Sequence, residues 1–149
     1  MKVLIVYDSL YGNTEKIAKA IGSAIVGEVK VLPVSEANPA ELKSLDLFIV
    51  GSPTQGGMAT KAMQAFLNKL PEVSLKGINV AAFDTRMTTK FVRIFGYAAK
   101  RIASSLKAKG GNLVVPPEGF FVTGSKGPLK VGELERAANW AKGIAEGKK

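Results

Sequence analysis

The sequence predicts a single α/β domain in which a parallel sheet is covered by helices on both faces. Three observations lead to this. Short runs rich in β-branched residues alternate with stretches at helical spacing, the runs are almost continuously apolar, and 149 residues with 46% hydrophobic content suffice for one core. Strands that are apolar on both faces are typical of parallel sheets, whose crossover helices cover both sides. We expect one domain at residues 1–146, followed by a short basic tail at 147–149.

The predicted strands are short apolar runs bounded by turn-forming residues. Pro116-Pro117 interrupts the last of them, because proline cannot donate to a sheet ladder, and divides it in two. The predicted strands are 3–7, 28–34, 47–51, 78–83 and, on either side of the prolines, 112–115 and 119–123.

The predicted helices have apolar residues three or four positions apart and recognisable end signals. The first covers 15–26, with Asn13 or Thr14 as its N-cap. A long basic helix at 91–109 stops at Gly110-Gly111, since glycine is the usual residue after a helix end. The remaining predicted helices are a short one from Pro39 to Lys43, one at 61–70 that ends before Pro71, and one at 131–144.

The loop between the first strand and the first helix is suited to a phosphate. A helix N-terminus carries unpaired N–H groups and a partial positive charge, so small polar residues there form an anion site. Ser9 and Thr14 offer hydroxyls, Asn13 offers an amide, and Gly12 allows the backbone to approach a ligand closely. Asp8 is expected to turn away and pair locally. A capped turn without a ligand is the alternative interpretation.

Composition excludes many kinds of chemistry. The chain has no cysteine and no histidine, which removes disulfides, thiolate catalysis, the commonest general base and the commonest metal ligands. Scattered aspartates do not make a metal site, and we assign neither a metal nor a catalytic residue. No apolar stretch approaches the roughly 20 residues of a membrane span, so a soluble, cytoplasmic protein is expected. Chemistry carried by a bound cofactor is the leading possibility.

Taken together, the YDSLYGNTEKIAKAI opening, the GSPTQGG loop after the third strand and the interrupted fifth strand resemble the flavodoxin-like FMN-binding family over nearly the whole chain. Ser9, Gly12, Asn13 and Thr14 fall on the family's Thr/Ser-x-Thr-Gly-x-Thr phosphate loop. Tyr11 stands where a hydroxyl residue is usual, and its backbone N–H can still contribute. The resemblance implies a three-layer α/β/α sandwich with a five-stranded parallel sheet of order 2-1-3-4-5, and FMN outside the strand C-termini at the switch point.

The resemblance also assigns two loops to the flavin ring. The loop after the third strand is expected to border the ring, and a peptide that flips there would offer a carbonyl to a protonated N5. The loop after the fourth strand is expected at the pyrimidine end, where a guanidinium near N1 and O2 would favour the anionic reduced flavin. The residues concerned are Pro53, Thr54, Gln55, Gly56 and Gly57 in the first loop and Asp84, Thr85 and Arg86 in the second.

Neither loop contains the Trp or Tyr that usually covers the ring in free flavodoxins. The candidates to cover the flavin ring are Met58 or Met87, a substrate, a partner, or another subunit. Phe95 and Tyr97 lie near the start of the long helix, where they could reach over the ring, and core packing is the favoured interpretation.

Two functions follow from the resemblance. The first is an electron-transfer protein whose flavin cycles between oxidised, semiquinone and hydroquinone states. The alternative is an FMN-dependent quinone or related reductase with its substrate stacked over an open flavin face. A domain that has lost its flavin is a third possibility.

The charge of the chain points to the partner. Lysine and arginine total 21 against 12 acidic residues, a net charge of +9, whereas flavodoxins are typically acidic. The expected partner is therefore an acidic redox protein, and a quinone or an anionic membrane surface is the alternative. Nucleic acid is not expected as a partner, because only the positive charge of the chain favours it. A solvated basic face is the simplest alternative. The segment 87–97 interleaves aromatic and basic residues, as a docking surface or an amphipathic membrane-facing turn would. The basic residues concentrate at Lys90, Arg93, Lys100, Arg101, Lys107 and Lys109.

Overall fold

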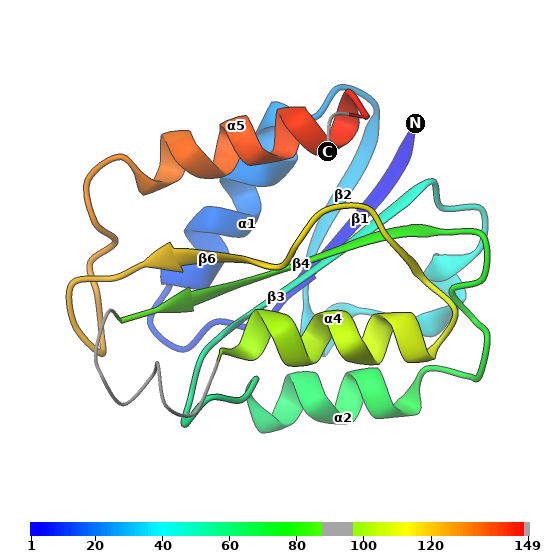
Figure 1. The fold of residues 1–149 in the computed structure, drawn as a ribbon, viewed down its shortest axis with the longest axis horizontal. Coiled ribbons are helices and arrows are strands. Elements are labelled where there is room, and N and C mark those ends of the chain that lie inside the picture. Colours follow the sequence, from blue (N-terminus) through cyan, green and yellow to red (C-terminus); the bar gives the residue numbers. More distant parts are fainter. Residues whose placement is uncertain (88–96, 148–149) are drawn as a thin grey trace.

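The computed structural model of the protein describes residues 1–87 and 97–147 and shows three layers (Figure 1). A central sheet lies between α1 (Asn13–Ala24) and α5 (Glu133–Ala145) on one face and α2 (Lys61–Lys69) and α4 (Ala98–Ala108) on the other. The expected three-layer α/β/α sandwich is thereby confirmed. Two 3-10 helices, η1 (Val34–Glu36) and η2 (Pro39–Leu42), lie between the second and third strands.

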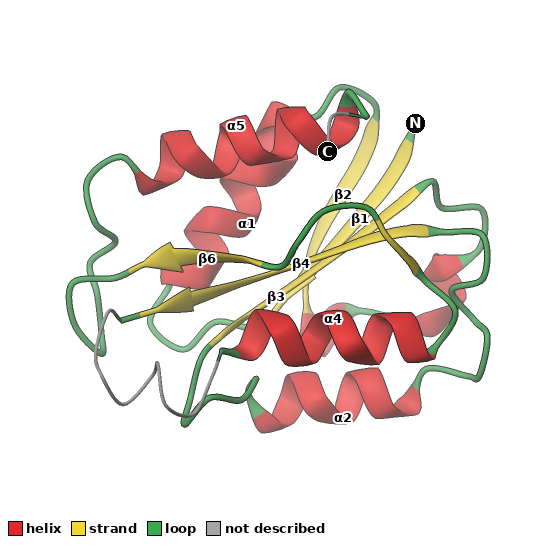
Figure 2. Ribbon diagram, in the orientation of Figure 1, coloured by secondary structure: helices red, strands yellow, loops and turns green. Residues whose placement is uncertain are grey.

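The sheet is parallel throughout, and Figure 2 shows its strands in yellow between the helices. Its order is β2-β1-β3-β4-β5, and β6 also pairs with β4, which confirms the expected 2-1-3-4-5 arrangement. The carboxyl ends of the strands therefore meet at one edge. The strands are β1 (Lys2–Tyr7), β2 (Glu28–Pro33), β3 (Leu47–Pro53), β4 (Asn79–Arg86), β5 (Asn112–Leu113) and β6 (Glu118–Phe121).

The interrupted last strand forms as the prolines predict. Leu113 of β5 pairs with Val80, and Glu118 of β6 pairs with Phe83, so both halves continue along the same neighbour. Val114 still donates its N–H to the carbonyl of Val80, and residues 115–117, which include Pro116-Pro117, leave the ladder, because proline has no N–H to donate. The second half thereby reaches the carboxyl edge of β4.

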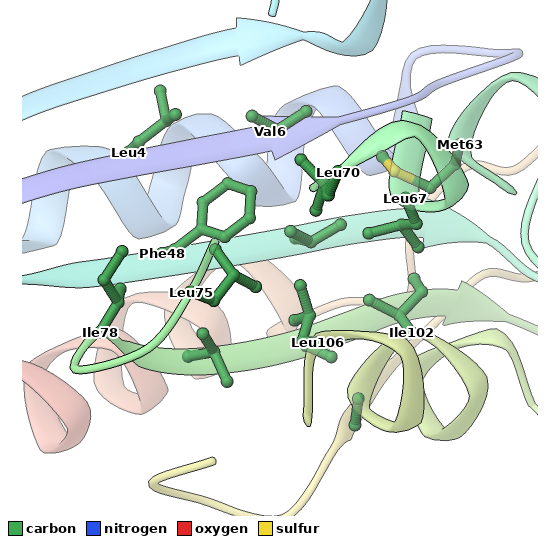
Figure 3. Close-up of a cluster of buried hydrophobic side chains, with 14 of the residues drawn as sticks. Leu4, Val6, Phe48, Met63, Leu67, Leu70, Leu75, Ile78, Ile102 and Leu106 are labelled. Atoms are coloured by element: carbon green, nitrogen blue, oxygen red, sulfur yellow. The ribbon is translucent and has the colours of Figure 1, made fainter. Parts of the chain in front are cut away.

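Hydrophobic side chains form one cluster on each face of the sheet. On one face, Phe48 of β3, Met63 of α2 and Ile102 of α4 are buried in the same cluster (Figure 3). On the other face, Phe83 and Phe120 pack edge to face with their ring centroids 6.1 Å apart. Burial on both faces explains why the strands read as continuous apolar runs.

Some predicted element boundaries are corrected by the structure. The N-cap of α1 is Gly12, with φ 90°, and not Asn13 or Thr14, which belong to the helix itself. The described part of the long basic helix begins at Ala98, and residues 91–96 lie outside the described residues, as does the end of the basic tail at 148–149. Within residues 1–87 and 97–147, no helix combines the length and apolarity that a bilayer crossing requires.

Candidate functional site

The three loops singled out in the sequence meet at the carboxyl edge of β1, β3 and β4. The N–H of Asp8 donates to the carbonyl of Gly51 at 3.1 Å, which joins the first loop to the end of β3. The N–H of Thr54 donates to the carbonyl of Thr85 at 2.9 Å, which joins the second loop to the end of β4. The hydroxyls of Thr14 and Thr85 lie 2.8 Å apart and are buried, so the first and third loops are also in contact. One continuous site results.

The first loop forms a cradle of backbone donors, comprising residues 9–14. Ser9 Oγ accepts hydrogen bonds from the N–H groups of Gly12 at 3.0 Å and Glu15 at 3.4 Å, which leaves its own hydroxyl hydrogen to donate. Among the described residues, the N–H groups of Tyr11, Asn13 and Thr14 find no acceptor. Unpaired donors at a helix N-terminus are the chemistry that binds a phosphate.

Gly12 keeps the cradle open. It adopts the left-handed conformation with φ 90°, which glycine reaches without steric cost. No heavy atom within 4 Å would meet a Cβ built on this residue, so the space beside it is free of protein in the described part of the chain. The donor set of residues 9–14 and the free space beside Gly12 therefore fit a phosphate group.

Asp8 turns away from the cradle, as expected. Its Oδ1 accepts a hydrogen bond from the N–H of Ser9 at 2.9 Å, and its Oδ2 accepts one from the hydroxyl of Thr60. Thr60 is the N-cap of α2 and accepts from the N–H of Met63 at 3.2 Å. The carboxylate thus connects the first loop to the start of α2.

A fourth loop, which sequence reasoning missed, lies beside the cradle. Asn13 Nδ2 donates to the carbonyl of Lys126 at 3.2 Å, and a Cβ on Gly127 would come within 2.5 Å of the Asn13 side chain. Lys126 Nζ lies 5.9 Å from the centre of the exposed Tyr11 ring. This loop follows the last strand of the sheet, and its position at the carboxyl edge was the available signal.

The loop after β3 closes in a two-residue turn. Gln55 and Met58 exchange backbone hydrogen bonds of 2.8 and 3.0 Å, and Gly56 and Gly57 between them have φ values of 55° and 81°. Positive φ at both central positions is typical of a type I′ hairpin, which explains the Gly-Gly pair. Met58 is 40% exposed beside this turn.

Arg101 on α4 anchors that turn from outside. Its Nε donates to the carbonyl of Gly57 at 3.0 Å. The peptide between Gly57 and Met58 is therefore held at both of its polar groups. Among the described residues, neither the carbonyl of Gly56 nor the N–H of Gly57 has a partner, so the peptide that joins them is unrestrained by hydrogen bonds. Sequence reasoning identified Arg101 only as a surface charge.

The loop after β4 contains a buried ion pair. Asp84 is 0% exposed, and its two carboxylate oxygens lie 2.7 and 2.8 Å from Nε and Nη2 of Arg86. The Arg86 side chain is 15% exposed, and its Cζ lies 3.4 Å from the centre of the Tyr97 ring. Gly119 on β6 provides the room, because a Cβ there would clash with the Arg86 guanidinium.

The same carboxylate caps α4. The N–H of Ala99 donates to Asp84 Oδ2 at 2.9 Å, and the N–H of Ala98 donates to Thr54 Oγ1 at 3.1 Å. Burial raises the pKa of Asp84 above its ordinary value, and the hydrogen bonds and charge of Arg86 oppose that rise. Loops two and three are thereby tied to the start of α4.

The contacts expected between the flavin ring and the loops after β3 and β4 stay predictions. In the structure, Asp84 and Arg86 form an ion pair with each other. Tyr97, expected to pack in the core, is half-buried against the Arg86 guanidinium. Phe95 lies outside the described residues. Pro53 is partly buried at the end of β3, where it pairs with Thr85. Residues 1–87 and 97–147 hold no group of three or more acidic residues close enough to bind a metal ion.

Comparisons with known proteins agree with this geometry. Residues 4–117 match the model of a flavodoxin domain. A flavodoxin from Picosynechococcus sp. is 27% identical over an alignment of 116 residues that covers 76% of this chain and 68% of that protein. An NAD(P)H dehydrogenase (quinone) from Brucella anthropi is 25% identical over an alignment of 150 residues that covers 85% of this chain and 75% of that protein. A solved structure of a flavodoxin from the domain Archaea has a TM-score of 0.83 at 27% identity and covers 98% of this chain and 97% of its own.

Proposed function

The chain belongs to the flavodoxin domain family, and on this premise we propose how its residues hold FMN and present it to a redox partner. Members of the family bind FMN and transfer electrons, and this chain is a flavodoxin-like electron-transfer protein. FMN, when bound, supplies reversible uptake and release of electrons. The chain supplies the binding groups, their orientation and the electrostatic surroundings.

The cradle at residues 9–14 holds the phosphate. The unpaired N–H groups of Tyr11, Asn13 and Thr14 and the hydroxyl of Ser9 donate to its oxygens, and the partial positive charge of the α1 N-terminus adds to the attraction. Gly12 keeps the approach free of a side chain. This group of unpaired donors at the switch point of the sheet is the observation that carries the proposal.

The loops after β3 and β4 border the ring system. The unrestrained peptide between Gly56 and Gly57 is free to turn its carbonyl or its N–H toward a ligand, while Arg101 fixes the next peptide. Thr85 is placed by its hydroxyl contact with Thr14. The buried pair of Asp84 and Arg86 holds the third loop against α4 and places a guanidinium near the same edge. The remaining residues assigned to the ring are Pro53, Thr54 and Gln55.

A carrier between proteins is favoured over a quinone reductase. The similarity to a flavodoxin structure extends over 98% of this chain and 97% of that one. That flavodoxin therefore has no further domain beyond the part that matches this chain. The redox partner is an acidic protein, because the chain carries a net charge of +9.

The experiment that tests this function is an anaerobic reduction of the FMN-loaded protein followed by mixing with an acceptor. A carrier passes its electrons rapidly to a one-electron protein acceptor such as plastocyanin and only slowly to a soluble benzoquinone presented at the same concentration. Faster oxidation by the quinone, with saturation in quinone concentration, would favour the reductase instead.

A further inference from the structure

The two helices on one face of the fold carry positive charge that no acidic residue of these helices offsets. The helices α2 and α4 lie side by side on that face (Figure 1) and carry five basic residues and no acidic one. On the opposite face, α1 and α5 carry three acidic and four basic residues. The two helices of the first face therefore produce a field of a single sign. The basic residues of this face are Lys61 and Lys69 on α2 and Lys100, Arg101 and Lys107 on α4.

These charges are available to a partner. All four lysines are exposed, and none of them makes an ion pair with another described residue. Their charges are therefore not neutralised within the described part of the chain, in contrast to Lys30 and Lys109, which pair with glutamates.

A groove of about 340 Å³ runs between the two helices. Its lining includes the amide side chains of Gln64 and Asn68 and the hydroxyl of Ser105, which can donate hydrogen bonds to carboxylates. Met58 and Arg101 form its end at the turn after β3. The groove therefore extends from the basic face to a loop assigned to the ring.

We propose that the face formed by α2, α4 and this groove is the docking surface for an acidic redox protein. The proposal rests on the proposed function, since it is the bound flavin that gives docking at this place a purpose. Acidic side chains of the partner lie over the lysines and in the groove, while Met58 provides a small apolar contact next to the ring loops. A charged rim around a small apolar contact is typical of transient redox interfaces, and complementary charge raises the rate of encounter.

The described residues favour a protein over a membrane or a nucleic acid. Insertion into a bilayer needs an apolar stripe beside the basic residues, and Met58 is the only large hydrophobic side chain exposed among the described residues of α2, α4 and the groove. Aromatic side chains for stacking on bases are equally absent from the exposed positions of these two helices.

The test compares two double variants with equal net charge. Lys61→Glu/Lys100→Glu reverses two charges at the ends of α2 and α4 that lie nearest the site. Lys19→Glu/Lys142→Glu reverses two exposed charges on the opposite face of the sheet, on α1 and α5. Each FMN-loaded protein is reduced and mixed in a stopped-flow instrument with plant plastocyanin, an acidic copper protein, or with cytochrome c, a basic haem protein. The second-order rate constants are measured at several salt concentrations.

With the wild-type chain, the rate toward plastocyanin should fall as salt is added. The Lys61→Glu/Lys100→Glu variant should lose about tenfold or more at low salt and gain toward cytochrome c, whereas the control variant should change by less than about threefold. Equal losses in both variants, or a plastocyanin rate that does not depend on salt, would overturn the proposal. The corresponding Lys→Gln variants repeat the comparison with smaller perturbations if either Glu variant folds poorly.

Two further measurements separate the possible failures. The FMN content of each protein, and the reduction of its FMN by dithionite, are determined first. If the wild-type chain binds no FMN, or its FMN is not reduced, the proposed function itself is contradicted and not the docking surface alone. Sedimentation with phosphatidylserine vesicles tests the membrane. If the wild-type protein binds the vesicles, the Lys61→Glu/Lys100→Glu variant does not, and the plastocyanin rate is the same for both, the face binds a lipid surface and the proposed protein partner is refuted.

Discussion

Replacing Arg86 with methionine should destabilise the protein strongly, because the Asp84 carboxylate would stay buried without its counter-ion. Asp84 is 0% exposed, and both of its oxygens are within 2.8 Å of the guanidinium. Removing one partner of a buried ion pair costs about 3–5 kcal/mol in the free energy of unfolding. Methionine retains much of the side-chain volume, so a cavity accounts for little of this loss.

The loss should depend on pH. Burial already raises the pKa of Asp84 against the opposing effect of Arg86, and removing Arg86 raises that pKa further. A carboxyl whose folded pKa lies above its unfolded value contributes stability below the unfolded pKa and loses that contribution as pH rises through the folded pKa. The deficit of Arg86→Met relative to the wild type should therefore be largest at neutral pH and shrink as the solution is acidified.

Urea unfolding of the FMN-free protein, followed by Trp140 fluorescence at neutral and mildly acidic pH, measures both effects. The control is Asp84→Asn/Arg86→Met, which removes the buried charge and should recover about 2 kcal/mol or more of the loss. A loss below about 1 kcal/mol for Arg86→Met, or a double variant no more stable than the single one, would refute the reasoning. In the FMN-loaded Arg86→Met variant, an unchanged potential for the second electron would show that Arg86 acts on the fold alone.

Three further predictions concern the site and its border. Gly12→Ala should lower the stability of the FMN-free protein by only about 1–2 kcal/mol, which is the cost of placing alanine in the left-handed conformation. The same change should weaken FMN binding at least about tenfold in a fluorescence titration, because the added Cβ enters the space beside the cradle. Equal affinity in the variant and the wild type would contradict the assignment of residues 9–14 to the phosphate. Arg101→Ala should release the Gly57 carbonyl and speed hydrogen exchange of the neighbouring amides, with partial rescue by Arg101→Lys, and unchanged exchange would count against the anchor. Burial is the larger cause, and the hydrogen bond to Glu15 the next, that raises the pKa of Tyr7 to about 12. An ultraviolet titration should therefore show one tyrosine ionising last. The contribution of Tyr7 to the free energy of unfolding is present below pH 10 and should be lost as the pH rises toward 12. A Tyr7→Phe variant that keeps the late ionisation would refute the assignment.

The fold could be predicted because local patterns and sheet rules agree along the chain. Apolar runs bounded by turn residues located β1, β3 and β4, and Pro116-Pro117 located the break between β5 and β6. The order of the sheet came from the family resemblance and was confirmed. The meeting of the three loops followed from parallel strands, whose carboxyl ends share an edge.

The details that sequence reasoning missed depend on contacts between distant residues. Arg86 is expected at the ring from its position, but its guanidinium lies between Asp84 and Tyr97, and Gly119 makes room for it from another strand. Arg101 reads as a surface charge on a basic helix, and only the packing of α4 beside the turn brings it to the Gly57 carbonyl. No spacing within the sequence encodes such pairings.

The predicted N-cap of α1 is wrong because residues distant in sequence engage the side chains of both predicted cap residues. Asn13 and Thr14 are favoured N-cap residues, yet the side chain of Thr14 is engaged with Thr85 and that of Asn13 with Lys126. Gly12 takes the cap position instead, because its positive φ lets the chain turn into the helix while Ser9 satisfies its N–H.

The central claim, that residues 9–14 bind the phosphate of FMN, is tested most directly by titrating the FMN-free protein with FMN and, separately, with riboflavin. The two ligands share the ring and differ in the phosphate. Charge-assisted hydrogen bonds contribute about 1.5–3 kcal/mol each, so two of them predict that FMN binds at least about 100-fold more tightly than riboflavin and that added inorganic phosphate competes only with FMN. Equal affinity for the two ligands, or no binding of FMN, would contradict the account and leave residues 9–14 as a capped turn.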